Sequence, residues 1–216
     1  MKPLAFDLCC GMGGWTDALL RRGFDVVGVD IYRSKHYMGE LLISDLMEFD
    51  ESRFLDEPRR SLVVASPPCT EFARWDKCPT WFVDRPAPDL GLVNRCRQIA
   101  ARLDVPLVLE NVRGAQSFIG TAVHHFASFY LWGDGVPPLL SPCDRRTARF
   151  KCRARSAAKR AHIPFQMAWQ VADFHADRIA AGEPPYRSGR FSGYEHETRV
   201  MRNQRLRRAR LEAGAA

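Results

Sequence analysis

A cysteine in a proline-rich turn is the first residue of this chain that could do chemistry. Cys69 follows the apolar run 61–66 and the pair Pro67 and Pro68. Each proline removes a backbone donor and restricts φ, so the chain must leave a sheet here in a rigid turn that holds the thiol at the end of a strand. Such a thiol is either inert packing or a nucleophile, and the turn alone leaves both interpretations open.

A second set of residues has the spacing of a nucleotide-binding turn. Asp7 lies in the apolar run 4–10, which ends in the glycine-rich segment 11–14, and Asp30 closes the next apolar run. Glycines let the backbone approach a ligand, and an acid at the end of the second strand can bind the hydroxyl pair of a ribose. The GxGG pattern departs from GxGxxG, which favours a nucleoside ligand without phosphates, such as S-adenosylmethionine. Asp45 ends the third run, where the adenine amino group would lie.

The elements that would position these residues alternate between strand and helix. We expect strands at 4–10, 25–30, 41–45, 61–66 and 105–111, and helices at 15–23, 92–103 and 163–182. This alternation predicts an α/β fold with a doubly wound, mainly parallel sheet, whose ligands bind beyond the carboxyl ends of the strands. Residues 112–150 are rich in glycine, proline and aromatic side chains, which favours an extended or β-rich insertion.

The same motifs occur together in a known enzyme family. The chain resembles the C-5 cytosine-specific DNA methyltransferases over residues 4–114, through the ordered segments FDLCCGMGG, GVDIY, ISDL, ASPPCT and LENVRG. The most specific part is the turn at Cys69 followed 41 residues later by Glu110 in a Glu-Asn-Val motif. The later segments FASFYLWG and IPFQMAWQVA resemble small phage-type members without a typical target-recognition domain. The resemblance implies a Rossmann-like methyltransferase that depends on S-adenosylmethionine.

For such an enzyme the resemblance implies chemistry on a cytosine flipped out of DNA. The Cys69 thiolate would attack carbon 6, which makes carbon 5 nucleophilic enough to accept the methyl group. Glu110 would hydrogen-bond ring nitrogen 3 and the exocyclic amine, while Asn111 would shape the turn. Arg153 and Arg155 stand in for the arginines of the family's Gln-Arg-x-Arg strand.

The resemblance also assigns residues to the S-adenosylmethionine pocket. Those residues lie at or just beyond the ends of the first four strands and comprise Asp7, Leu8, Gly11, Met12, Gly13, Gly14, Trp15, Asp30, Ile31, Asp45, Leu46 and Pro67. Trp15 could equally serve only to cap the core. The family's closing Gly-Asn-x-Val motif is not evident, so we expect the helix after Ile163 and Pro164 to take its place.

Charge divides the chain into two parts. The 216 residues carry a net charge of +7, yet residues 1–144 hold 15 basic and 19 acidic side chains, against 17 and 6 in residues 145–216. The basic segments 145–160 and 199–210 indicate a polyanionic partner, most simply nucleic acid, or else a solvated tail. The family resemblance implies that this nucleic acid is double-stranded DNA.

The expected domain organisation follows from this division. Residues 1–114 would form the catalytic core, residues 115–150 an insertion with a reduced target-recognition region, and residues 151–216 a basic segment that completes the core and contacts nucleic acid. So little chain follows the catalytic motifs that a partner or a second copy could supply target recognition.

The remaining features bear on compartment, metals and alternative functions. The chain contains no membrane-spanning run and no secretory signal, so we expect a cytoplasmic protein, in a bacterial or phage-infected cell, with reduced thiols. No metal is expected, because Cys69, Cys78, Cys143, Cys152, His124 and His125 lack the spacing of a zinc site. The aromatic residues Phe126, Phe129, Tyr130 and Trp132 either stack on bases or pack on the sheet. RNA or a free nucleotide as substrate, a modified sulfonium donor, and a non-catalytic binding protein remain alternatives.

Overall fold

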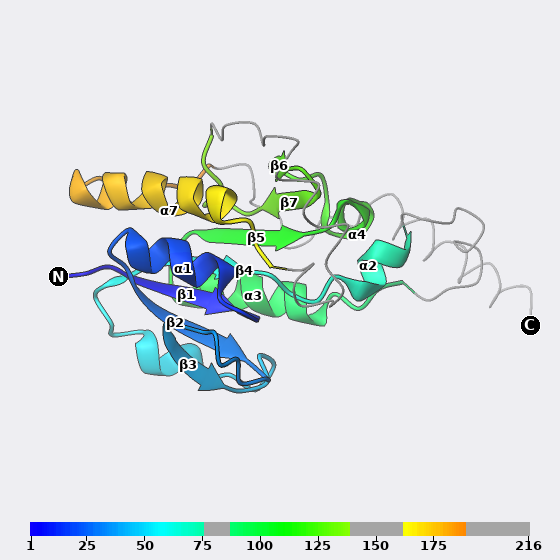
Figure 1. The fold of residues 1–216 in the computed structure, drawn as a ribbon, viewed down its shortest axis with the longest axis horizontal. Coiled ribbons are helices and arrows are strands. Elements are labelled where there is room, and N and C mark those ends of the chain that lie inside the picture. Colours follow the sequence, from blue (N-terminus) through cyan, green and yellow to red (C-terminus); the bar gives the residue numbers. More distant parts are fainter. Residues whose placement is uncertain (76–86, 139–161, 189–216) are drawn as a thin grey trace, which may run out of the picture.

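A seven-stranded sheet with the order β3-β2-β1-β4-β5-β7-β6 organises the chain (Figure 1). The computed structural model describes residues 1–75, 87–138 and 162–188. Its strands are β1 (Leu4–Leu8), β2 (Asp25–Asp30), β3 (Glu40–Ile43), β4 (Arg60–Ala65), β5 (Leu107–Asn111), β6 (His124–Phe126) and β7 (Phe129–Trp132). Strands β1 to β5 are parallel, whereas β7 is antiparallel to both of its neighbours. The prediction of a mainly parallel α/β sheet is confirmed.

Helices cover both faces of this sheet. The longer ones are α1 (Gly14–Arg21), α3 (Gly91–Arg102) and α7 (Phe165–Ala180), and the short ones are α2 (Thr70–Trp75), α4 (Gln116–Ile119) and the 3-10 turns η1 (Glu51–Phe54) and η3 (Arg113–Ala115). Helices α1 and α7 pack side by side on one face and α3 on the other, so the sheet is doubly wound (Figure 1).

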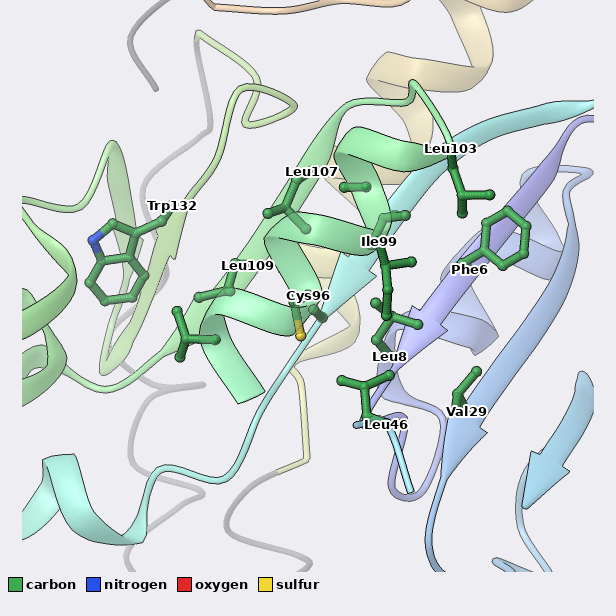
Figure 2. Close-up of a cluster of buried hydrophobic side chains, with 14 of the residues drawn as sticks. Phe6, Leu8, Val29, Leu46, Cys96, Ile99, Leu103, Leu107, Leu109 and Trp132 are labelled. Carbon is green, nitrogen blue, oxygen red and sulfur yellow. The ribbon is translucent and has the colours of Figure 1, made fainter. Parts of the chain in front are cut away.

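Two apolar layers explain why the strands read as nearly continuous hydrophobic runs. Successive side chains of a strand point to opposite faces, and both faces here are covered. Phe6 and Leu8 therefore pack toward Cys96 and Ile99 of α3 (Figure 2), while Ala5 packs on the side of α1 and α7. These layers fix the strand ends from which the functional residues project.

The hairpin of β6 and β7 confirms the β-rich character expected within residues 112–150. Residues 124–132 extend the main sheet beyond β5. Phe126, Phe129 and Trp132 are buried in the two apolar layers, so they pack on the sheet instead of presenting rings to bases. Residues 139–150 lie outside the described residues.

The predicted helix at 163–182 is confirmed as α7. Its interior face consists of Met167, Ala168, Val171, Ala172 and His175. Phe165 and Ile179 are 40% and 38% exposed because they lie at the two ends of the helix, where fewer neighbours cover them. Across the described part of the chain, no helix has the length and apolar character needed to cross a membrane.

Candidate active site

The glycine turn after β1 meets the carboxyl end of β2. Gly11 and Gly13 have φ values of +53° and +82°, in the left-handed region that glycine adopts without steric cost. The backbone amide of Gly11 donates a hydrogen bond of 2.9 Å to Asp30 Oδ2, and the amide of Tyr32 donates one of 3.0 Å to Asp30 Oδ1. The Asp30 carboxylate is thereby oriented at the rim of the turn, and each oxygen retains a lone pair for a ligand hydroxyl.

Asp7 lies beneath this turn rather than at its surface. Its side chain is fully buried, and its Oδ2 accepts a 2.7 Å hydrogen bond from Thr16 Oγ1 in the first part of α1. Burial raises the pKa of Asp7 to about 8. Leu8 is also fully buried. Neither side chain reaches a ligand directly, so both residues would act on a cofactor through the backbone that they hold.

Tyr37 packs against the glycine turn, and the sequence analysis missed it. Its ring lies next to Gly13 and Gly28, and any side chain at Gly28 would collide with the Tyr37 hydroxyl. That hydroxyl lies 2.8 Å from Thr16 Oγ1, which links it to Asp7. The polar segment around Tyr37 has no apolar periodicity, and only the glycine inside the predicted second strand hinted at a close approach.

The other residues assigned to the cofactor pocket differ in exposure. Asp45 and Ile31 are exposed, Met12 is half-buried, and Leu46 is buried. The amide of Ser44 donates a 3.0 Å hydrogen bond to the carbonyl of Asp30, which brings the ends of β2 and β3 together. The acids Asp30 and Asp45 consequently stand at neighbouring strand ends.

Trp15 and Gly14 join the turn to the rest of the core. Trp15 is 1% exposed, and its Nε1 donates a 3.0 Å hydrogen bond to Ser66 Oγ at the end of β4. A Cβ at Gly14 would lie 2.8 Å from the Cβ of Ile163, the residue shortly before α7. The segment at Ile163 and Pro164 therefore packs beside the glycine turn.

The catalytic candidates lie at the ends of the next two strands. Ala65 of β4 pairs with Leu109 of β5, so Cys69 and Glu110 project from the same edge of the sheet. Cys69 is half-buried, and its carbonyl accepts a 2.9 Å hydrogen bond from Ala73 in α2. Glu110 is buried, with 8% of its surface exposed.

Asn111 ties these two strand ends together. Its Nδ2 donates a 3.1 Å hydrogen bond to the carbonyl of Pro67, and its Oδ1 accepts one of 2.9 Å from the amide of Val112. The side chain is fully buried, so both bonds are protected from water. The role expected for Asn111, shaping the turn rather than reacting, agrees with these contacts.

Several predicted residues cannot be placed. Arg153 and Arg155, the basic segments 145–160 and 199–210, and the cysteines Cys78, Cys143 and Cys152 all lie outside the described residues. Within the described ranges, no three His, Cys, Asp or Glu side chains come together as ligands for a metal ion.

Comparison with known proteins yields structural similarity only. No protein-family model and no curated protein matches the chain. Among solved structures, it is similar to a protein described as a DNA modification methyltransferase encoded within an E. coli prophage, with 19% identity over 54% of this chain and 34% of that one and a TM-score of 0.40.

Two further similar structures have equally low scores. One is a Spodoptera frugiperda DNMT2 variant, with 23% identity over 53% of this chain and 37% of that one and a TM-score of 0.36. The other is an S-adenosylmethionine-dependent methyltransferase of Clostridium acetobutylicum, with 12% identity over 61% of this chain and 54% of that one and a TM-score of 0.35. The chain thus spans about a third to a half of the length of these structures, and scores this low do not assign its function.

Proposed function

We propose that this chain is an S-adenosylmethionine-dependent methyltransferase that acts on carbon 5 of cytosine in DNA. The observation that carries the proposal is the pairing of β4 with β5, which brings the proline-held Cys69 and the buried Glu110 to one edge of the sheet. The same edge carries the glycine turn and Asp30. A nucleophile, an acid or base, and a nucleoside cradle are the three parts that such a reaction needs.

The residues of the first three strand ends fit an adenosyl group. Asp30 has carboxylate lone pairs for the ribose hydroxyls, beside a turn where Gly11 and Gly13 allow close approach of the backbone. The exposed Asp45 offers an acceptor for the adenine amino group. When bound, S-adenosylmethionine would supply an electrophilic methyl group.

Cys69 and Glu110 would activate the cytosine. The Cys69 thiolate forms a bond to carbon 6, and the electron pair of the carbon 5–carbon 6 double bond moves toward ring nitrogen 3, where the carboxyl of Glu110 supplies a hydrogen bond or a proton. Carbon 5 of the resulting enamine would then take the methyl group as its bond to the sulfonium sulfur breaks, so that S-adenosylhomocysteine leaves as a neutral thioether and the proton on ring nitrogen 3 returns to Glu110. A base, such as a water molecule, would remove the proton from carbon 5, which restores the carbon 5–carbon 6 double bond and expels the Cys69 thiolate.

DNA is the substrate that best matches both the chemistry and the charge of the chain. The target base must leave the duplex to reach strand ends of this kind, which implies base flipping. Phosphate contacts would come from the arginine-rich part of the sequence, including Arg153 and Arg155. Target recognition in this proposal depends on residues 115–150 or on a partner chain.

The experiment that tests the proposal is methyl transfer from labelled S-adenosylmethionine to matched substrates. Duplex DNA, single-stranded DNA, RNA and free cytidine nucleotide are incubated with the protein, and the products are digested to nucleosides. We expect the label in 5-methyldeoxycytidine from duplex DNA. Label in RNA or in the nucleotide would mean that this molecule, rather than duplex DNA, is the substrate. Binding of DNA with no labelled product would indicate a non-catalytic protein.

A further inference from the structure

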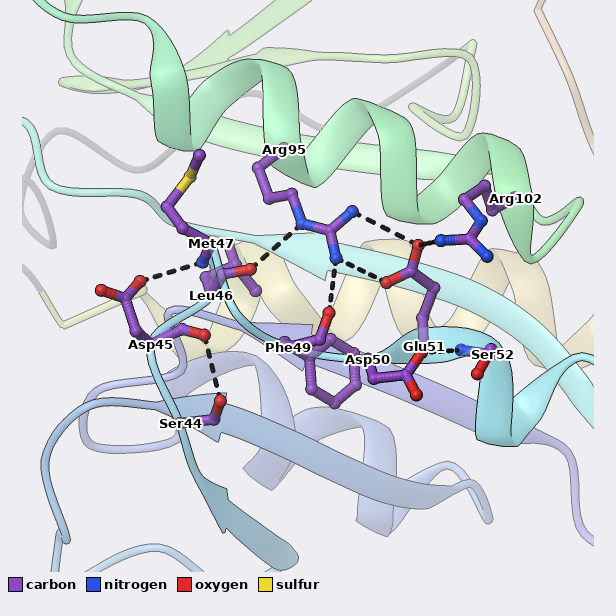
Figure 3. A network of polar contacts seen from close by, with 10 residues as sticks. All are labelled: Ser44, Asp45, Leu46, Met47, Phe49, Asp50, Glu51, Ser52, Arg95 and Arg102. Atoms are coloured by element: carbon purple, nitrogen blue, oxygen red, sulfur yellow. Dashed lines mark hydrogen bonds and ion pairs between the residues drawn. The ribbon is translucent and has the colours of Figure 1, made fainter.

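The loop between β3 and η1, residues 44–50, is held in place by one side chain of α3. Arg95 Nε donates a 3.1 Å hydrogen bond to the carbonyl of Leu46, and its Nη2 donates to the carbonyl of Phe49 (Figure 3). These two carbonyls bracket the centre of the loop. Because the guanidinium is planar and rigid, it fixes both acceptors at once relative to α3.

The guanidinium itself is fixed by a buried acid. Glu51 is fully buried, and its Oε2 and Oε1 lie 2.6 and 3.3 Å from Arg95 Nη2 and Nη1. Arg102 lies about two turns further along α3, and its Nη1 donates a 2.8 Å hydrogen bond to Glu51 Oε1. Burial alone would raise the pKa of Glu51, but the hydrogen bonds and charges of the arginines outweigh it and hold the pKa below its usual value. The anion therefore persists at neutral pH and orients Arg95.

The loop carries Asp45, whose two carboxylate oxygens differ in their hydrogen bonding. Asp45 Oδ1 accepts a 2.9 Å hydrogen bond from the amide of Met47, while the Asp45 carbonyl accepts bonds of 3.0 Å from Ser44 Oγ and from the amide of Glu48 (Figure 3). Asp45 Oδ2 has no partner among the described residues. The local bonds set the shape of the loop, and Arg95 sets its position on the sheet.

We propose that Arg95 is a positioning residue for recognition of the adenine ring, an inference that rests on the proposed function. By holding the carbonyls of Leu46 and Phe49, it keeps Asp45 where its free carboxylate oxygen can accept a hydrogen bond from the 6-amino group of the cofactor. A ligand that carries a carbonyl at that position, as inosine does, presents an acceptor to the same oxygen and is rejected. Arg95 thus controls which purine the site accepts, without contacting the cofactor.

The test compares two ligands that differ only at that position. Calorimetry measures the dissociation constants of S-adenosylhomocysteine and S-inosylhomocysteine for the wild-type protein and three variants. We expect the wild type to prefer the adenosyl ligand by about tenfold or more, the value of one well-placed hydrogen bond. Arg95→Met should bring the ratio close to one, and Arg95→Lys should give an intermediate ratio, since an ammonium cannot bridge both carbonyls and the carboxylate.

Arg102→Met is the matched control. Arg102 binds the same carboxylate as Arg95 but none of the loop carbonyls among the described residues, so this variant weakens only the support of Glu51 and should keep more of the wild-type ratio than Arg95→Met. The ratio does not depend on the folded fraction of a sample, which separates positioning from a loss of stability. If Arg95→Met folds too poorly, the double variant Arg95→Met with Glu51→Gln removes the buried charge that the single change leaves behind.

The outcomes separate this inference from the proposed function. A wild-type ratio that persists in Arg95→Met or in the double variant overturns the positioning role, as does an equal loss of the ratio in Arg102→Met. Binding of both ligands with equal affinity by the wild type also overturns it, while leaving the proposed function intact. Failure of the wild type to bind S-adenosylhomocysteine at all would remove the proposed function as well.

Discussion

The two halves of the carboxyl edge of the sheet are built differently. At the ends of β1, β2 and β3, three acids are held by separate contacts: Thr16 Oγ1 donates to Asp7, the amides of Gly11 and Tyr32 donate to Asp30, and the amide of Met47 donates to Asp45, while Arg95 holds the neighbouring loop. At the ends of β4 and β5, Asn111 Nδ2 ties the turn before Cys69 to β5. In the proposed function, the first group forms the cofactor half of this edge and the second forms the catalytic half. The cofactor half combines contacts within one loop with contacts between elements, whereas the Asn111 contact in the catalytic half joins two segments that are far apart in the sequence.

The largest effect that would sharpen this contrast is expected at Glu110. Glu110→Gln keeps the shape of the side chain but removes its proton-transfer capacity, so methyl transfer in a single turnover should fall by roughly 10²- to 10⁴-fold. Calorimetry with S-adenosylhomocysteine serves as the control and should give a dissociation constant within about twofold of wild type. A parallel loss of cofactor affinity would mean that Glu110 belongs to the cofactor half.

A substitution of Asp30 should weaken cofactor binding and leave the rate of methyl transfer nearly unchanged. Asp30→Ala removes hydrogen bonds to a charged acceptor, so the dissociation constant for S-adenosylhomocysteine should rise by about 10- to 100-fold, with little change in the rate at saturating cofactor. Asp30→Asn retains an acceptor for the amide of Gly11, so its affinity for S-adenosylhomocysteine should fall less than that of Asp30→Ala. A slower methyl transfer at saturating cofactor would show that Asp30 also acts in the catalytic half.

Asn111 tests the contact between β5 and the turn before Cys69 in the catalytic half. Asn111→Asp can still accept from the amide of Val112 but cannot donate to the carbonyl of Pro67, so the turn that holds Cys69 loses its tie to β5. We expect a roughly tenfold slower methyl transfer and a free energy of unfolding lower by about 1–3 kcal/mol. Cofactor affinity, measured by calorimetry, should stay unchanged, and a change there would show that the halves are coupled.

The last effect is on stability rather than on methyl transfer; it lies in the cofactor half and depends on pH. The pKa of Asp7 is about 8 in the folded protein, raised by burial from 3.8, so the folded state keeps a proton that the unfolded state releases above pH 4. This stabilising contribution is complete below pH 4 and is lost as the pH rises to 8. Asp7→Asn has no such loss, so its melting temperature should rise relative to wild type between pH 5 and pH 8 in calorimetric scans. A constant difference across that range would contradict the raised pKa.

The sequence predicted the local parts of this structure better than its long-range parts. The strands β1 to β5, the helices α1, α3 and α7, and the glycine turn follow from periodicity and from glycine positions. Composition predicted a β-rich stretch there, but not that the hairpin of β6 and β7 joins the main sheet, because its pairing with β5 is a tertiary contact that composition does not encode. Each apolar run near residue 126 is too short to distinguish a core strand from a loop.

The site shows the same division between local and long-range information. Asp30 and Asp45 are marked by their positions at the ends of apolar runs, whereas the packing of Tyr37 on the glycine turn has only the indirect signal of Gly28. Arg95 and Arg102 are seven residues apart in a predicted helix, which places them on one face, yet nothing local identifies Glu51 as their partner. The pairing becomes visible only when the β3–η1 loop packs beneath α3.

Covalent trapping by DNA that contains 5-fluorocytosine tests the central claim most directly. Fluorine replaces the proton that must leave carbon 5, so the thiolate cannot be expelled after methyl transfer and the protein stays attached to the DNA. With S-adenosylmethionine present, wild type and a control variant, Cys9→Ala, should form an adduct that survives denaturing electrophoresis. Cys69→Ala should form none while still binding S-adenosylhomocysteine; an adduct that persists in Cys69→Ala, or the absence of one in an active wild-type protein, would contradict the account.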